Sequence, residues 1–324
     1  MKYHLYLLAA AVAIVARPLD AAPLPKKQIA ADAKWLVHVD LQNLRKTKLG
    51  EFATKGVLEN AIAPLKSQLG IDVNGLIERV GSITAYGTDF QKNPEASGVL
   101  LVQLDGEAQK IVEGLLAAQM LADTKETIKK SQLDGVISYS AENKLALAIH
   151  PNHLVVVGKS QKQVDKAAEV LAGKAQNLTA SESFSDFPAP PNAFFFLAVA
   201  EGFNSNAAIP PQAEVLRKAD GARIIIGEEV EKLFVDLSLR AKSVDVSQQI
   251  QQVIEGIRAM VSLSQIENKD LQELVRSINV STKGKLVTVR ADFPVGALIK
   301  RIEHEVHEGH GGKKGAAKAK AGSE

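Results

Sequence analysis

The chain repeats part of its own pattern, and this repeat constrains the fold more than any other feature of the sequence. Residues 98–117, GVLLVQLDGEAQKIVEGLLA, form an apolar strand pattern, a turn and a helical pattern. Residues 231–259, EKLFVDLSLRAKSVDVSQQIQQVIEGIRA, repeat that order, and KIVEGLLA aligns with QVIEGIRA. Self-similarity of this kind indicates a fold assembled from two copies of one unit.

Other segments match in the same order along the chain. The matching pairs are WLVHVDLQNL (35–44) with FFFLAVAEGF (194–203), GSITAYG (81–87) with GARIIIG (221–227), and HLVVVGKS (153–160) with KLVTVRAD (285–292). We therefore predict an α+β fold of two similar halves, each a mainly antiparallel sheet packed with amphipathic helices. The pattern leaves open whether the halves share one sheet or pack as two lobes.

Alternation within the strands predicts which face is buried. In residues 233–240 every second residue is apolar, beginning at Leu233, and the residues between them are Phe234, Asp236, Ser238 and Arg240. Period-two alternation predicts one buried apolar face and one wetter face. The helices are expected to cover the apolar face through two stripes, Ile111, Leu115 and Leu116 in the first half and Ile250, Val253, Ile254 and Ile257 in the second. Hairpins are expected at 145–149 with 153–158 and at 275–281 with 285–292.

Composition along the chain sets the expected boundaries. The first α+β repeat spans 30–175 and includes a helical insert at 51–69. A Ser- and Pro-rich stretch at 176–192 reads as an extended connector. The second repeat spans 193–305, and a Gly/Ala/Lys tail at 306–324 lacks core-forming residues and is expected to be disordered.

The first 22 residues match a secretory signal peptide. A short positive start at Lys2 precedes twelve apolar residues, LYLLAAAVAIVA, and small residues permit cleavage after Ala21 or Ala22. Twelve residues are too few to cross a bilayer, and no transmembrane segment is expected in the mature chain. The protein is therefore predicted to be exported, periplasmic or secreted. The absence of cysteine excludes disulfides and thiolate nucleophiles.

The segment ADAKWLVHVDLQNL, residues 31–44, follows shortly after this leader. Together with the duplicated pattern over most of 30–305, it resembles a group of exported bacterial proteins of unknown function with a duplicated α+β domain. The resemblance implies no catalytic residues.

Nothing in the chain forms an enzyme signature, and no cofactor is expected. The strand-to-helix turn at Asp105-Gly106 holds one glycine, whereas a phosphate cradle requires several, so this turn is read as a connection. His38 and Asp40 share a face of one strand and could act as an oriented base, although no nucleophile motif accompanies them. The alternative for this pair is a solvated sheet face.

Histidines elsewhere are candidate metal ligands. His150 and His153 flank a turn and could hold a metal, but the polarity of a turn explains them equally well. His304, His307 and His310 recur every three residues in HEVHEGHGG, and imidazole suits zinc, copper or nickel. A polar, disordered end is the alternative for these three.

The charges of the tail suggest an anionic partner. Lys313, Lys314, Lys318 and Lys320 could contact an anionic component of the cell envelope, or they could serve solubility alone. The net charge of +2 and the lack of aromatic residues in the tail argue against a specific nucleic-acid partner.

The sequence thus favours an exported, non-enzymatic binding or scaffold protein of the bacterial cell envelope. Two alternatives remain: a hydrolase-type enzyme with a site near His38 and Asp40, and a weak metal-binding protein that acts through its histidine-rich tail.

Overall fold

The computed structural model describes residues 24–54, 78–89, 97–122, 127–133, 135–141, 145–202, 217–263 and 269–304. The expected signal peptide, most of the helical insert and the tail lie outside the described residues.

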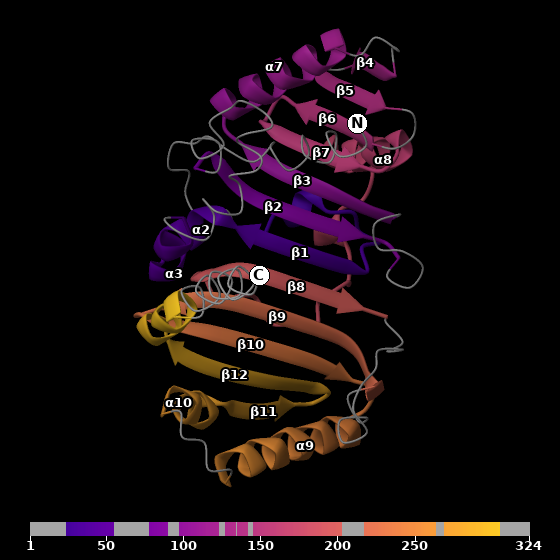
Figure 1. Ribbon diagram of the computed structural model, residues 1–324. Coiled ribbons are helices and arrows are strands. Elements are labelled where there is room, and N and C mark those ends of the chain that lie inside the picture. Colours follow the sequence, from indigo (N-terminus) through magenta and orange to yellow (C-terminus); the bar gives the residue numbers. More distant parts are fainter. Residues whose placement is uncertain are drawn as a thin grey trace, which may run out of the picture.

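The described strands form one antiparallel sheet with the order β11-β12-β10-β9-β8-β1-β2-β3-β7-β6-β5-β4 (Figure 1). In chain order the strands are β1 (Trp35–Asp40), β2 (Val80–Gly87), β3 (Gly98–Leu104), β4 (Ile128–Leu133), β5 (Val136–Ala141), β6 (Leu145–His150), β7 (Leu154–Gly158), β8 (Phe194–Glu201), β9 (Ala219–Glu229), β10 (Lys232–Ala241), β11 (Asn279–Lys283) and β12 (Leu286–Pro294).

The centre of the sheet is the antiparallel pair β1 and β8, in which Trp35 lies opposite Ala200 and His38 opposite Leu197. From this pair the order runs outward as β1-β2-β3-β7-β6 on one side and as β8-β9-β10-β12-β11 on the other. The hairpin β4–β5 extends the first side only. The sequence left open whether residues 30–175 and 193–305 contribute to one sheet, and the described strands of both ranges belong to the same sheet.

Helices lie at both ends of the sheet and on both of its faces. They are α2 (Leu41–Arg45), α3 (Lys48–Phe52), α7 (Gly106–Ala122), α8 (Gln161–Leu171), α9 (Val244–Leu263), α10 (Lys269–Ser277) and helical residues 295–304. Figure 1 shows α7 and α9 at opposite ends of the sheet. Because α10 continues to Ser277, β11 begins at Asn279 rather than at the predicted residue 275.

The expected helix stripes are confirmed at Leu116 of α7 and at Ile250 and Ile254 of α9, and are wrong at Ile111 and Ile257. Ala108, Val112 and Leu116 of α7 are buried against β3, β6 and β7, and Ile111 is exposed. On α9, Ile250 packs with Ala241 and Val287, while Ile257 is exposed. The four-residue spacing of the buried α7 residues places them on one side of that helix.

Strand register defines two faces of the sheet. The face that carries Leu36, His38 and Asp40 of β1 is covered by α8 and by the connector, residues 176–192, and we call it the connector face. The face that carries Trp35, Val37 and Val39 is covered by α7 at one end and by α9 at the other. We call this second face the hollow face.

On β10 the expected pattern of burial is reversed. Phe234 and Ser238 are completely buried, whereas the predicted core residues Leu233, Val235, Leu237 and Leu239 are only half-buried. The prediction of a wetter face here was wrong, because the connector covers that face and its polar side chains pair with one another.

Candidate functional site

The hollow face presents three apolar rows across seven consecutive strands. Register aligns Leu100, Ala85, Val37, Ala198, Ile224, Leu237 and Val289 in the middle row. The flanking rows are Gly98, Gly87, Trp35, Ala200, Ala222, Leu239 and Val287 on one side and Val102, Ile83, Val39, Phe196, Ile226, Val235 and Ala291 on the other. No position in these rows carries a charged side chain.

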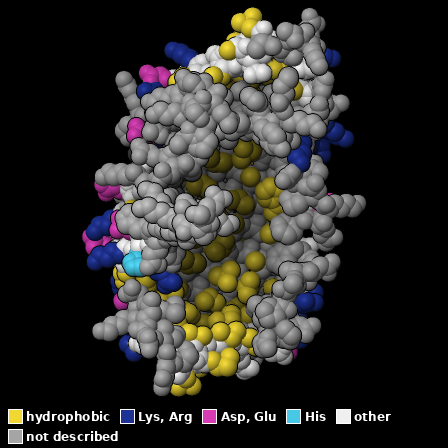
Figure 2. All heavy atoms as spheres, viewed as in Figure 1, with side chains coloured by type: hydrophobic (Ala, Val, Ile, Leu, Met, Phe, Trp, Pro, Cys, Tyr) yellow, Lys and Arg dark blue, Asp and Glu magenta, His cyan; other side chains and the backbone are white. Residues whose placement is uncertain are grey.

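The middle of this face is not sealed by the described helices. Val37, Ala198, Ile224 and Leu237 are half-buried, in contrast to the fully buried side chains beneath α7. Figure 2 shows hydrophobic side chains gathered in a hollow over the central strands. With strands about 4.8 Å apart, seven strands give a row roughly 29 Å long.

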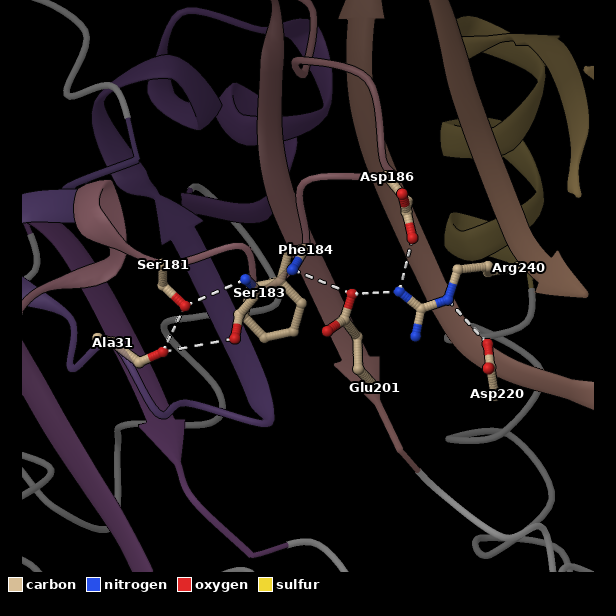
Figure 3. Close-up of polar contacts among 8 residues, drawn as sticks. All are labelled: Ala31, Ser181, Ser183, Phe184, Asp186, Glu201, Asp220 and Arg240. Atoms are coloured by element: carbon tan, nitrogen blue, oxygen red, sulfur yellow. Dashed lines mark hydrogen bonds and ion pairs between the residues drawn. The ribbon is translucent and has the colours of Figure 1, made fainter. Parts of the chain in front are cut away.

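The connector is fixed to the opposite face by a chain of polar contacts (Figure 3). Ser181 Oγ donates to the carbonyl of Ala31 at 2.7 Å, and the backbone N–H of Phe184 donates to Glu201 Oε1 at 3.0 Å. Arg240 completes the chain, donating to Glu201 and Asp186 through Nη1 and to Asp220 through Nε. These contacts connect the connector with β8, β9 and β10.

A second arginine lies beneath the connector. Arg223 of β9 donates to the carbonyl of Pro188 through Nη1 and to Asp236 Oδ1 and Ser238 Oγ, at 3.3 and 3.1 Å, through Nη2. Burial lowers the pKa of its guanidinium from the ordinary value, and Asp236 opposes that change. Arginine nonetheless remains charged in proteins.

Neither arginine was singled out from the sequence. Both alternate with apolar residues in their strands, and such charges read as a solvated face. The signal that could have revealed a covered face lies in the connector, where Phe184 and Phe187 interrupt an otherwise small and polar stretch.

The structure places His38 and Asp40 inside the sheet rather than on a solvated face. They are 0% and 1% exposed. His38 Nδ1 lies 2.8 Å from Thr84 Oγ1, and Asp40 Oδ1 accepts from the backbone N–H groups of Gln42 and Asn43, which caps α2. Burial raises the pKa of Asp40, and the two backbone hydrogen bonds partly offset this. Neither side chain lines the cavity beside Asp105, the cavity beside α8 or the cavity beneath the connector.

The turn at Asp105-Gly106 borders an open cavity of about 1090 Å³. The Asp105 carboxylate already accepts from the first free N–H groups of α7, those of Glu107 and Ala108. A carboxylate in this place repels a phosphate, and the charges around the cavity are of both signs, including Arg79, Lys110 and Glu113. A second cavity of about 620 Å³ beside α8 is likewise lined by charges of both signs, Asp32, Glu169, Lys162 and Lys166.

His150, His153 and His304 are the histidine candidates for a metal among the described residues. His153 Nδ1 is 2.7 Å from Gln109 Oε1, and burial lowers the pKa of His150. His304 is exposed at the end of the described chain, while His307 and His310, like the four tail lysines, lie outside the described residues. Among the residues that the structure describes, no group of three or more potential ligands could hold a metal.

Among the same residues, no helix combines the length and the apolar character that a bilayer crossing requires.

Comparison with known proteins gives few matches. No family model matches the chain, and no curated protein matches it. The structure of crystal form III of TP0453 is similar with a TM-score of 0.47 and 11% identity, over 87% of this chain and 98% of that one. Crystal form I of TP0453 gives a TM-score of 0.42 and 11% identity, over 87% and 97%. Neither likeness bears on function.

Proposed function

We propose that this chain is an exported, non-enzymatic binding protein of the bacterial cell envelope that holds an apolar ligand against the hollow face of its sheet. The observation that carries the proposal is the set of three uncharged rows that cross β3, β2, β1, β8, β9, β10 and β12.

The extent of this apolar surface supports a binding role. Three rows about 6.7 Å apart and roughly 29 Å long cover about 400 Å² of sheet. Val102 and Val287, toward the two ends, are buried in the clusters of α7 and α9, so the part open to a ligand is the middle of the rows. A core surface of this kind is normally sealed, as it is beneath α7. Half-burial of the side chains in the middle row leaves contact area for a ligand.

The composition of the rows indicates the class of ligand. The Trp35 indole N–H is the one polar side-chain group in them, and it already donates to the carbonyl of Asp89 at 3.2 Å. A polar ligand would therefore find no hydrogen-bond partner among these side chains and would lose those it makes with water. Hydrocarbon groups fit this chemistry.

The order of the strands supports a duplicated body. We infer that the repeats at 30–175 and 193–305 each contribute five strands in the corresponding order, and that β4 and β5 are an addition to the first repeat. Export rests on the leader pattern at 1–22 and on the resemblance of residues 31–44. On this proposal the tail lysines, beginning at Lys313, contact an anionic component of the envelope.

Titration with the neutral fluorescent probe N-phenyl-1-naphthylamine tests the proposal. We expect the wild-type protein to increase the fluorescence of the probe in a saturable manner. Ile224→Asp should bind the probe at least tenfold more weakly, because a carboxylate in the middle row must be desolvated when the probe binds.

The matched control is Leu133→Asp, which makes the same chemical change at an exposed leucine on β4. It should bind the probe like the wild type. Equal binding by all three proteins, with thermal unfolding showing that Ile224→Asp is folded, would remove the hollow face as the binding surface. If Ile224→Asp is unfolded, Ala198→Gln replaces it, and undiminished binding by that variant has the same meaning.

A further inference from the structure

A cavity lies between the connector and the sheet, on the face opposite the hollow. Its volume is about 380 Å³, within the range typical of small-molecule sites. Leu36, Leu197 and Val199 from β1 and β8 form an apolar floor together with Arg223 of β9. Phe184 and Phe187 of the connector contribute to the opposite wall.

The charges around this cavity have one sign. Lys26 and Arg223 are the charged side chains among its lining residues, and no acidic side chain joins them. Ser185 adds a hydroxyl on the connector side, whereas the hydroxyls of Ser181 and Ser183 already donate to the carbonyl of Ala31. The lining is therefore complementary to an anion that has an apolar body.

Arg223 supplies the anchor. Its side chain is 4% exposed, and its Nη groups are hydrogen-bonded to Pro188, Asp236 and Ser238, but its Nε–H is buried without an acceptor. A buried donor without a partner destabilises the state that contains it. A carboxylate oxygen beside Nε would satisfy this donor with a charge-assisted hydrogen bond.

We propose that the cavity binds a small amphipathic monocarboxylate, whose carboxylate accepts from Arg223 Nε–H and whose hydrocarbon chain lies between the floor of β1 and β8 and the two connector phenylalanines. This site is independent of the function proposed for the hollow face. Arg223 Nε is buried, so the connector must shift before a ligand can reach it. The ion pairs of Arg240 with Asp186 and Glu201, together with apolar contacts, hold the connector in the position seen here.

Calorimetric titration with octanoate tests the proposal on the full chain. We expect one octanoate per chain, at least tenfold weaker binding of 1-octanol and of propionate, and no binding of octylammonium. The first comparison removes the charge, the second removes the hydrocarbon chain, and the third reverses the charge.

The variant that tests the anchor is Arg223→Gln combined with Asp236→Asn, because the double change leaves no unpaired carboxylate under the connector. Octanoate should bind this variant at least tenfold more weakly than the wild type. Arg290→Gln is the control: Arg290 lies on the same face and pairs with Asp292, but it does not line the cavity. It should bind octanoate as the wild type does.

Absence of octanoate binding, or equal affinity for octanoate and 1-octanol, would overturn the proposal. If the double variant does not fold, Ala189→Trp serves in its place, since it fills the cavity from the exposed side of the connector, and unchanged binding would again overturn it. Ile224→Asp separates the two sites: octanoate binding that survives this change belongs to the cavity, and binding that is lost with it belongs to the hollow face.

Discussion

Two neighbouring isoleucines on β9 meet different surroundings. Ile225 lies on the connector face with no exposed surface and belongs to the cluster that contains Leu36, Leu197 and Phe234. Ile224 lies on the hollow face, between Ala198 and Leu237, and is half-buried. The comparison teaches that burial on this sheet depends on which segment covers a face, and not on how apolar the face is.

The connector face contains most of the buried polar side chains, including His38, Arg223 and Ser238. Its side chains are nevertheless the more fully buried ones, because the connector covers them and these polar groups pair with one another and with a connector carbonyl. The hollow face has no such pairs over its central rows, and apolar contact is the interaction available there.

The largest expected effect is a difference between two substitutions one residue apart. Ile225→Ala should lower the free energy of unfolding by about 3 kcal/mol, since it opens a cavity in a sealed cluster, and Ile224→Ala should lower it by about 1 kcal/mol. Urea denaturation measures both values, and each variant is the control for the other. Equal losses would show that the two faces are packed alike.

The next effect concerns how the connector is held. Arg240 forms ion pairs with Glu201, Asp220 and Asp186 at 2.8, 2.8 and 2.9 Å, and its side chain is largely buried. Arg240→Gln should destabilise the protein by about 2 kcal/mol, a value between those of surface and buried pairs. It should also accelerate proteolytic cleavage within residues 176–192.

Arg290→Gln provides the comparison for that variant, because Arg290 is more exposed and does not contact the connector. Arg290→Gln should lower the free energy of unfolding by less than about 1 kcal/mol, and proteolytic cleavage of the connector should be unchanged. Faster cleavage in both variants would mean that the ion pairs of Arg240 do not specifically fix the connector to the sheet.

The smallest effect is a dependence on pH. The pKa of Asp40 is raised above 3.8 by burial, so the folded state binds this proton more tightly than the unfolded state does. The resulting stability is present below pH 3.8 and is lost as the pH rises through the pKa of the folded state. Asp40→Asn keeps the cap of α2 and removes this loss.

Urea midpoints of wild type and Asp40→Asn between pH 3.5 and 7 measure the effect. The urea midpoint of Asp40→Asn should rise relative to that of the wild type as the pH increases from 3.5 to 7. Parallel curves would show that Asp40 titrates as it does in the unfolded chain.

Much of the fold follows from local pattern, since hairpins, helices and alternation depend on neighbouring residues. The strand Leu233–Arg240 shows a property that local pattern does not predict. Its two sets of side chains were assigned correctly to opposite faces, but which set is buried depends on the connector, about fifty residues away in the chain. The two-residue alternation of a strand carries no information about which distant segment will cover one of its faces.

The same limit applies to the sites. His38 and Asp40 attract attention as residue types, yet both are buried within the sheet, where His38 contacts Thr84 and Asp40 Oδ1 accepts from the first N–H groups of α2. The hollow and the cavity are made by register between strands and by a crossing segment. Neither is contained in any single stretch of sequence.

The pairing of β1 with β8 has a consequence for how the molecule is made. Trp35 must find Ala200, which the ribosome adds much later, and contacts so distant in sequence form slowly because a long loop has to close. Until then the free edge of β1 is exposed to other chains. Among the described strand pairs this one joins the residues farthest apart in the chain, so the edge of β1 waits longest for its partner, and a helper that shields nascent strands would act there.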